Sequence, residues 1–452
     1  MFRFIDRKDE LAALERDWNT AENAFIVVFG RRRIGKTKLV EQFLKNKEHA
    51  RYTAEDASKK VQITELRKVM ASCLGDEFLA SQDIAEWGAL FSYLEKAIDK
   101  KKKLCIWIDE FSYIIKNDAS VVSVIQKFID SFVRDSKLFL IVSGSLYGLM
   151  SEKVLSNSSP LYGRRTRDLL LKPMPAGFIK EFVHFESEDC IKTALSIGGI
   201  PEYLNVAARH KTYIDFIRHE FFAHDGYFFR EPFFLLSQEF KEIRTYFSIL
   251  NAIAYGNSRP TEIANFVGLN AREIYPYLEL LISYGFVGRD TSITGDKKVG
   301  LYYIADTFLD FWFSFVHKNR EFIEAGIFNV KDSELNAYFG KRFEIFLKEN
   351  FFRFFSKYAL AGRWWHDGEE IDIVALNDKT DEILFCECKW QDNVDANKVL
   401  AELKRKASLV EWRKDTRKEA YCIFAKSFKG SLKGAQAILF DLKEISRNTN
   451  MD

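Results

Sequence analysis

The chain has 452 residues, a formal net charge of +2, a hydrophobic content of 47% and a charged content of 29%. These values are typical of a folded globular protein with roughly two to four domains, and they exclude nucleic-acid binding through overall charge, so any such contact must come from local patches. No signal peptide and no long apolar run is present, so we expect a cytoplasmic protein without a membrane partner. Six scattered cysteines without a C-x-x-C pair argue against a zinc site and predict buried, reduced thiols.

Residues 4–11 open the chain with a charged segment, and helical spacing continues to Trp18. The residues alone predict an amphipathic helix. The segment also resembles the F-x-D/G/N-R-x-x-E-L/I entry of AAA-type ATPases, and that resemblance implies packing near an adenine.

A phosphate-loop pattern, G-x-x-x-x-G-K-S/T, lies between an apolar run of strand length (24–29) and a stretch of helical spacing (38–44). The two glycines allow the backbone to curl its N–H groups around phosphates, and the start of the helix adds partial positive charge. The lysine is expected to reach the β- and γ-phosphates of ATP, and the threonine hydroxyl to hold Mg²⁺. The predicted nucleotide-binding residues are Gly30, Arg31, Arg32, Arg33, Ile34, Gly35, Lys36, Thr37 and Lys38.

Two further apolar runs end in polar side chains. Residues 104–108 precede Asp109 and Glu110, as in a parallel strand that is covered on both faces. We expect Asp109 to bind Mg²⁺ and Glu110 to polarise the attacking water. Residues 137–142 precede Ser143 and Ser145, and the sequence does not decide which of the two hydroxyls senses the γ-phosphate.

A loop at residues 159–167 carries three arginines. Arg164 is a candidate arginine finger, from its own chain or from a neighbouring copy, although surface arginines are often only solvated. Together with the phosphate loop, Asp109-Glu110 and the serines, this loop resembles the archaeal-type ATPases, P-loop proteins of the AAA+/STAND assemblage. Residues 198–204 are similar to the G-G-x-P-x-Y motif of that family, which implies a helical lid that closes over the nucleotide.

The pattern changes after residue 240. Helices are expected at 242–255, 261–267 with Thr261 as N-cap, and 270–284, followed by strands at 286–289 and 300–304 around Lys297 and Lys298. This is a winged-helix layout. The helix at 270–284 would be the second helix of the helix–turn–helix and would face DNA. It carries Arg272 but also Glu273 and Glu279, so both DNA contact and a protein-packing role stay open. Residues 306–316 resemble the aromatic signature that opens the C-terminal domain of the family.

Residues 336–452 contain a second group of acids. Glu344 falls on a predicted helix, Asp372 on the first strand of a predicted hairpin, and Glu387 and Lys389 on one face of the second strand. Acids within a sheet are costly unless they share a cation, so Asp372, Glu387 and the Cys388 carbonyl are expected to hold Mg²⁺. Lys389 would then position or activate water, and Glu344 would brace the site.

This spacing resembles the PD-(D/E)xK nuclease motif, although Ile371 stands where proline is usual. Residues 398–452 hold 13 Lys or Arg against 7 Asp or Glu, a net charge of +6, consistent with a flank that faces phosphates. The alternative is a structural ion cluster in a domain without catalysis.

The predicted architecture is an α/β P-loop ATPase domain (1–172), a helical lid (173–240), a winged helix (241–305), a helical connector (306–335) and a nuclease-like domain (336–452). The predicted function is a Mg²⁺-dependent ATPase whose nucleotide state controls DNA binding or cleavage, with ATP and DNA as partners and a homo-oligomer as a further possibility. The alternative is a nucleotide-controlled switch or scaffold with an inactive nuclease-like domain.

Overall fold

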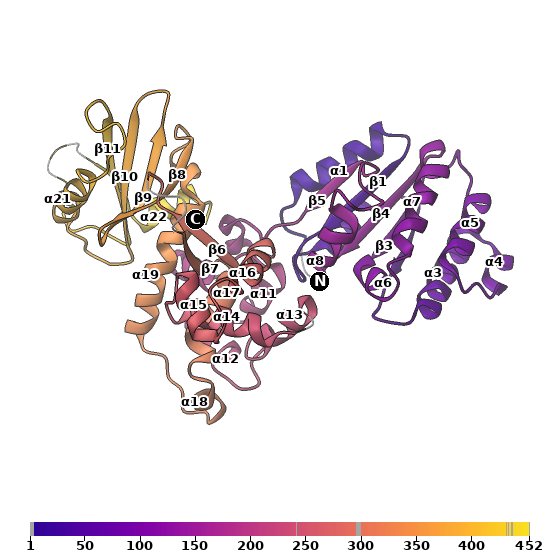
Figure 1. The fold of residues 1–452 in the computed structure, drawn as a ribbon, viewed down its shortest axis with the longest axis horizontal. Helices are drawn as coiled ribbons and strands as arrows, with labels where there is room; N and C mark the ends of the chain where they lie inside the picture. The colour runs from indigo at the N-terminus through magenta and orange to yellow at the C-terminus, as the bar shows by residue number, and fades with distance from the viewer. Residues whose placement is uncertain are drawn as a thin grey trace. The chain divides into compact units, whose positions relative to one another are not determined.

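The computed structural model describes residues 4–240, 242–294, 300–430, 432, 434 and 437–451. The chain forms two compact units, Met1–Pro173 and Met174–Asp452 (Figure 1). Within the described residues, none of the helices combines the length and the apolar character that crossing a bilayer requires. The cysteines are free thiols, and all except the half-buried Cys73 are buried, as expected.

The first unit is built on a five-stranded parallel sheet of order β2-β3-β4-β1-β5. Strands β1, β3 and β4 are buried along their whole length, because helices cover both faces of the sheet. The predicted apolar runs therefore form its central strands. The strands are β1 (Ala24–Phe29), β2 (His49–Thr53), β3 (Leu104–Asp109), β4 (Leu138–Gly144) and β5 (Arg167–Leu170).

Helices α3, α5, α6 and α7 cover one face of this sheet and share a core with inward side chains of β1, β3 and β4. On the other face, Trp18 of α1 packs against Phe139 of β4, with ring centroids 4.7 Å apart. The helices of this unit are α1 (Lys8–Thr20), α2 (Lys36–Phe43), α3 (Lys59–Leu74), α4 (Glu77–Ser81), α5 (Trp87–Ala97), α6 (Phe111–Asn117), α7 (Val121–Ser131) and α8 (Tyr147–Met150).

The second unit begins with helices whose aromatic side chains form a continuous core. Phe221, for example, stacks on Phe228 at 4.6 Å and meets the edge of Phe311 at 4.9 Å. Its first helices are α9 (Ile179–Phe182), α10 (Ser187–Ile197), α11 (Pro201–Ala207), α12 (Tyr213–Glu220), α13 (Glu231–Glu239), α14 (Arg244–Ala254), α15 (Pro260–Val267) and α16 (Ile274–Ser283).

Strands β6 (Val287–Thr291) and β7 (Gly300–Ile304) form a two-stranded antiparallel sheet after α16. The predicted loop residues Lys297 and Lys298 lie outside the described residues. The aromatic segment that follows is α17 (Thr307–Phe311) with a π-helical continuation, Trp312–His317, and then α18 (Arg320–Glu324).

The remaining residues form a second five-stranded sheet of order β12-β11-β10-β9-β8. The pairs β8–β9 and β9–β10 are antiparallel, which confirms the predicted hairpin, whereas β10–β11 and β11–β12 are parallel. Helices α19 and α21 pack against β10. The elements are α19 (Asp332–Glu349), α20 (Phe351–Phe354), β8 (Leu360–His366), β9 (Glu369–Asn377), β10 (Glu382–Lys389), α21 (Ala396–Ala407), β11 (Lys418–Ala425), β12 (Ile438–Phe440) and α22 (Leu442–Asn448).

Two sequence-based details differ from the structure. Helix α15 begins at Pro260, so Thr261 is not its N-cap; instead the Glu262 carboxylate accepts hydrogen bonds from the backbone N–H groups of Ser258 and Arg259. Proline favours the first helical position because its fixed φ suits the helix and its missing N–H is not needed there. The predicted boundary between residues 335 and 336 falls inside the continuous helix α19.

Candidate nucleotide-binding site and C-terminal acidic cluster

The phosphate loop connects the end of β1 to the start of α2. Gly30 has a φ of 146°, and a Cβ at this position would lie 2.5 Å from the Leu171 carbonyl oxygen. Gly35 has a φ of 94° and forms the N-cap of α2. A side chain is therefore excluded at Gly30 by the neighbouring backbone and disfavoured at Gly35 by its conformation. The loop places the N-terminus of α2, with the N–H groups of its first turn, at the carboxyl edge of the sheet.

Lys36 is buried, and its ammonium donates to the carbonyl oxygens of Gly30 and Arg31 at 3.0 and 3.1 Å. The outer side of the loop is held by Arg7, which sequence analysis did not select. Its guanidinium donates to the Ile34 carbonyl at 3.2 Å and to the Lys172 carbonyl at 2.7 Å. The charged opening segment of the chain therefore fixes the phosphate loop to the residues that follow β5.

Asp109, at the end of β3, is 1% exposed and is the centre of a hydrogen-bond network. Its Oδ2 atom accepts from the Thr37 hydroxyl at 3.0 Å, and its Oδ1 atom accepts from the Ser143 hydroxyl at 2.6 Å. Ser143 in turn accepts from the indole N–H of Trp107 at 2.8 Å. The predicted metal-binding residues Thr37 and Asp109 are thus adjacent, and their oxygen atoms are the kind that Mg²⁺ prefers.

Arg51 of β2 also reaches this network and was missed by sequence analysis. Its Nη2 atom lies 3.6 Å from Asp109 Oδ2, and its guanidinium stacks over the Trp107 ring at 4.5 Å. The signal was the alternating pattern of residues 49–53, where the arginine lies on a strand at the edge of the sheet.

Glu110 follows with a φ of 53°, an uncommon left-handed conformation for a side chain other than glycine. Its Oε2 atom accepts hydrogen bonds from both the backbone N–H (3.1 Å) and the hydroxyl (2.6 Å) of Ser145. The two serines that the sequence left undecided therefore contact different acids: Ser143 orients Asp109, and Ser145 orients Glu110.

Other predicted site residues have partners away from the phosphate loop. The Arg164 guanidinium binds both oxygens of Asp130 on α7 at 2.7 to 2.9 Å. Lys38 is exposed and pairs with Glu41 at 2.7 Å. Arg32 is exposed as well, whereas Arg33 is half-buried in a left-handed conformation with a φ of 67°.

In the second unit, Asp372 of β9 and Glu387 of β10 are buried within the sheet, at 8% and 6% exposure. Asp372 Oδ2 accepts a hydrogen bond from the Cys388 backbone N–H at 2.8 Å. Burial, followed by repulsion from Glu344 and Glu387, raises the pKa of Asp372 well above its usual value. Burial likewise raises the pKa of Glu344, which projects from α19.

Two lysines neutralise part of this charge. Lys389 lies 2.7 Å from Glu387 Oε1, as expected for two side chains on one face of β10. Burial lowers the pKa of Lys389, but the hydrogen bond to Glu387 and the attraction of Glu387 and Asp372 together outweigh burial, so that the pKa is raised overall. Lys406 of α21, which sequence analysis missed, lies 3.3 Å from the same carboxylate oxygen. In the described part of the chain, Glu344, Asp372 and Glu387 do not bring three ligand oxygens within 4.8 Å of one another.

Comparison with known proteins places these sites in a family. Residues 4–206 match the family described as an ATPase domain predominantly from Archaea. The chain is also 36% identical to the uncharacterized protein MJECL04 of Methanocaldococcus jannaschii over 456 residues, which cover 98% of this chain and 100% of that protein. The chain belongs to the archaeal-type P-loop ATPases. The matched ATPase domain of this archaeal-type ATPase covers nearly the whole first unit and continues into the second as far as residue 206.

Other similarities agree with this assignment. Over 44 residues, 10% of this chain and 75% of the relative, the ATPase is 52% identical to the uncharacterized ATP-binding protein MJ0423 of M. jannaschii. The Walker-type ATPase PABY2304 of Pyrococcus abyssi shares the fold with a TM-score of 0.50, at 20% identity, over 69% of this chain and 96% of that one. Residues 312–399 match a family described as archaeal and bacterial proteins of unknown function.

The G-G-x-P-x-Y residues of the archaeal-type ATPase have structural roles within the second unit. A Cβ on Gly199 would lie 1.9 Å from the Met174 carbonyl oxygen, so only glycine fits there. Pro201 begins α11, and the Tyr203 hydroxyl donates to Glu231 at 3.0 Å. These contacts account for the motif by packing, and closure over the nucleotide stays a prediction.

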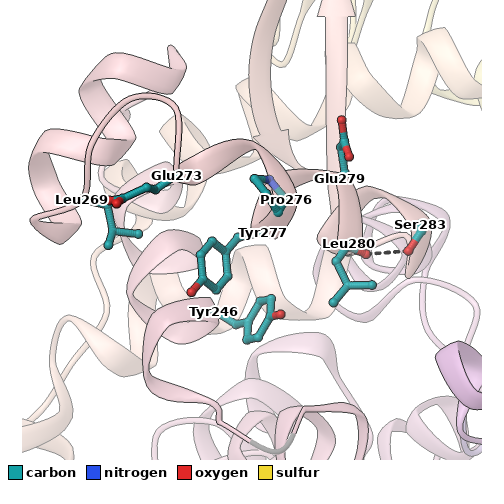
Figure 2. Close-up of a pocket in the computed structure, with 8 residues that line it drawn as sticks. All are labelled: Tyr246, Leu269, Glu273, Pro276, Tyr277, Glu279, Leu280 and Ser283. Carbon is teal, nitrogen blue, oxygen red and sulfur yellow. Dashed lines mark hydrogen bonds between the residues drawn. The ribbon is translucent and has the colours of Figure 1, made fainter.

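A surface pocket of about 960 Å³ runs along α16, the predicted DNA-reading helix. Figure 2 shows the rings of Tyr246 and Tyr277 side by side at this pocket, with centroids 5.2 Å apart. Glu273 and Glu279 also line it, and the lining that the described residues form contains no lysine or arginine. An apolar pocket with acidic edges suits a peptide segment better than a phosphate backbone.

Proposed function

We propose that this protein is a Mg²⁺-dependent ATPase whose nucleotide state controls DNA binding or cleavage by the acidic cluster of the second unit. The proposed DNA cleavage is supported by the arrangement of Asp372, Glu387 and Lys389 on two adjacent buried strands. The nucleotide part is supported by the network around Asp109.

In the nucleotide site, Thr37 and Asp109 offer adjacent oxygen atoms that suit Mg²⁺, which would neutralise charge on the phosphates of ATP. Lys36 donates to loop carbonyls, so its ammonium exchanges these acceptors for phosphate oxygens when nucleotide binds. Glu110 accepts two hydrogen bonds through Oε2, which fixes the carboxylate so that its other oxygen is available to polarise the attacking water.

Two variants test this assignment. Lys36→Ala is expected to lose ATP affinity, because it removes the ammonium that we expect to contact the β- and γ-phosphates. Glu110→Gln keeps the size of the side chain and is expected to bind ATP but to hydrolyse it at least 100-fold more slowly, the typical contribution of a positioned base being about 10² to 10⁴. Wild-type turnover in Glu110→Gln would remove Glu110 from this role.

In the second unit, Asp372, Glu387 and the Cys388 carbonyl are the donors that would hold Mg²⁺, and Lys389 would orient the attacking water beside a DNA phosphate. Two observations support this proposal. First, Glu344 lies on α19, Asp372 on β9, and Glu387 and Lys389 on β10, the order of a helix followed by a hairpin on which the resemblance to the PD-(D/E)xK motif rests. Second, burial and the neighbouring Glu344 and Glu387 raise the pKa of Asp372, so a divalent cation bound beside it would stabilise its ionised form.

The test is incubation of the full chain with linear, circular and single-stranded DNA, in Mg²⁺ or Mn²⁺, with ATP, with ADP and without nucleotide. We expect cutting that depends on the nucleotide and that disappears in Asp372→Asn, which keeps the acceptor for the Cys388 N–H. Glu382→Gln, on the neighbouring strand β10, half-buried and paired with Lys357, is the matched control. Equal cutting by wild type and Asp372→Asn would refute the proposal.

A second function, a nucleotide-controlled switch without cleavage, is favoured by the contacts of Glu387. Both Lys389 and Lys406 already bind this carboxylate, an arrangement that is stable without a metal ion. The acidic pocket along α16 also suits a protein partner. This function predicts an ATP-dependent change in mass by light scattering and no DNA cutting under any of the conditions above.

A further inference from the structure

Two histidines and two acids converge on α12 and the loop before it, and none of them belongs to the phosphate loop or to the C-terminal acidic cluster. His210 lies in the loop that precedes the helix, whereas Asp215, His219 and Glu220 lie on the helix itself. Asp215 and His219 are four residues apart and therefore share one helix face. Among the described residues, His210, Asp215 and His219 form a group whose three potential ligand atoms lie within 4.8 Å of one another.

The separations in this group match the coordination shell of a small cation. Nδ1 of His210 lies 3.2 Å from Asp215 Oδ2, and Nδ1 of His219 lies 3.2 Å from Asp215 Oδ1. Zinc binds nitrogen and oxygen ligands at about 2.0 to 2.2 Å, so the edges of its tetrahedron measure about 3.3 to 3.6 Å. The two His–Asp separations, each to a different oxygen of Asp215, are close to such an edge, and all three ligand atoms lie within 4.8 Å of one another.

Glu220 fixes the orientation of the His210 ring. Its Oε1 atom lies 2.8 Å from His210 Nε2, and its Oε2 atom accepts from the Tyr227 backbone N–H at 3.1 Å. A carboxylate that accepts a hydrogen bond from the N–H of one ring nitrogen leaves the other nitrogen with its lone pair, and metal-binding histidines are commonly oriented in this way. For His210 this nitrogen is Nδ1, which faces Asp215.

We propose that His210, Asp215 and His219 bind a divalent first-row transition ion of the zinc type, with Glu220 as the positioning residue for His210. His219 and Asp215 are 65% and 43% exposed, so water from the solvent would complete the coordination shell. His219 Nδ1 also donates to the Asp215 carbonyl at 2.8 Å, so a proton leaves this ring or the ring turns when the ion binds. Bound there, the ion would link the loop after α11 to α12.

The competing explanation is an ion pair without a metal, in which a protonated His210 lies between the carboxylates of Asp215 and Glu220. Both explanations place the same groups together, but only a metal site gives saturable binding that depends on the exposed His219. The cysteine pattern could not indicate this site, because none of its donors is a thiol.

The test uses the full chain, free of nucleotide and treated with a chelator, in the Asp372→Asn background so that the C-terminal cluster does not compete. Titration calorimetry with ZnCl₂ is expected to show one ion per chain. We expect Glu220→Gln to weaken binding by about 10- to 100-fold, the usual effect of removing a carboxylate that orients a ligand. His219→Ala, which removes a ligand, is expected to weaken zinc binding further. His224 is also exposed but lies outside the group, so His224→Ala should bind zinc as the Asp372→Asn parent does.

Replacing Zn²⁺ by Co²⁺ identifies the donors. Visible bands of a nitrogen- and oxygen-ligated ion, without thiolate charge transfer, are expected, and they should disappear in His219→Ala. The calorimetric heat should depend on the buffer, because binding displaces protons from the imidazoles, and affinity should fall as the pH is lowered. The proposal is overturned by an absence of saturable binding, by unchanged affinity in His219→Ala, or by a thiolate spectrum.

Discussion

Replacing Ser143 by alanine is expected to destabilise the ATPase unit. Its hydroxyl is fully buried, donates to the Asp109 carboxylate at 2.6 Å and accepts from the Trp107 indole at 2.8 Å. Alanine removes both bonds at once and leaves a buried carboxylate oxygen and a buried N–H without these partners. After this change Asp109 Oδ1 still accepts from the Glu110 backbone N–H at 3.1 Å, whereas the buried Trp107 indole N–H loses its Ser143 acceptor.

The size of the effect follows from these two losses. A hydrogen bond to a charged group contributes about 1.5 to 3 kcal/mol, and an unpaired buried donor costs about 1 to 3 kcal/mol, so we expect a loss of about 3 kcal/mol or more. For a unit of this size, 1 kcal/mol corresponds to roughly 2 to 4 °C, which gives a decrease in Tm of roughly 6 to 12 °C. Because Asp109 loses its fixed orientation beside Thr37, the Mg²⁺ dependence of ATP hydrolysis should also shift to higher Mg²⁺ concentration.

Calorimetric unfolding and ATPase titrations against Mg²⁺ measure these effects. Trp107→Phe removes the indole donor, so in that background Ser143→Ala should cost only about half as much, as a double-mutant cycle reveals. Ser145→Ala is the matched control: Glu110 keeps the Ser145 backbone N–H, so stability should fall by about 1 kcal/mol while hydrolysis slows. A Ser143→Ala protein within about 0.5 kcal/mol of wild type would refute the reasoning, since that is the range of neutral surface substitutions.

Three further predictions concern the phosphate loop, Arg164 and Asp372. Gly30→Ala should abolish ATP binding and lower the Tm, because its Cβ would lie 2.5 Å from a backbone oxygen. The control is Gly163→Ala, which is also at positive φ but has open space around it and should lower the stability by only about 1 kcal/mol. Equal Tm values for the two variants would contradict this prediction. If Arg164 acts as an arginine finger, Arg164→Ala should slow ATP hydrolysis by about 10³-fold or more. Asp130→Asn, which removes only the ion-pair partner of Arg164, should leave turnover intact. Equal turnover in wild type and Arg164→Ala would assign the ion pair a structural role. Folding raises the pKa of Asp372 above the ordinary value of about 3.9, so the folded protein holds this proton more tightly than the unfolded chain does. The folded protein therefore loses stability as the pH rises from that ordinary value through the raised pKa. Asp372→Asn should therefore gain more Tm over wild type at pH 8 than at pH 5, measured by calorimetry in a chelator, and a smaller gain at pH 8 would reverse the assigned sign.

Much of the ATPase unit was predictable because its signals are local. Burial on both faces requires continuous apolar runs, and the three runs ending at Phe29, Asp109 and Gly144 form the central strands of the sheet. Phosphate binding requires glycines at fixed positions, which the residues at 30 and 35 supply. By contrast, β2 was not recognised, because its alternating, partly exposed residues resemble a loop as much as an edge strand.

In the C-terminal acidic cluster, too, the contacts within one hairpin were predictable and the contact from a distant helix was not. The hairpin of β9 and β10 followed from the turn residues and the charged positions within apolar strands, and the pairing of Glu387 with Lys389 followed from the two-residue period of a strand. Lys406 was not predictable, because it approaches Glu387 from a helix 19 residues further along the chain.

The sequence by itself determined the phosphate loop, the strands that carry the acids, and the residues that stand two or four apart on one element, since these depend on backbone conformation and local periodicity. The tertiary structure alone decided which partner each polar group meets: Ser143 with Asp109, Ser145 with Glu110, Arg164 with Asp130, and His210 with Asp215. A buried hydrogen bond or ion pair is selected by distance and direction in space, and residues that are far apart in the sequence reach those positions only when the strands and helices pack.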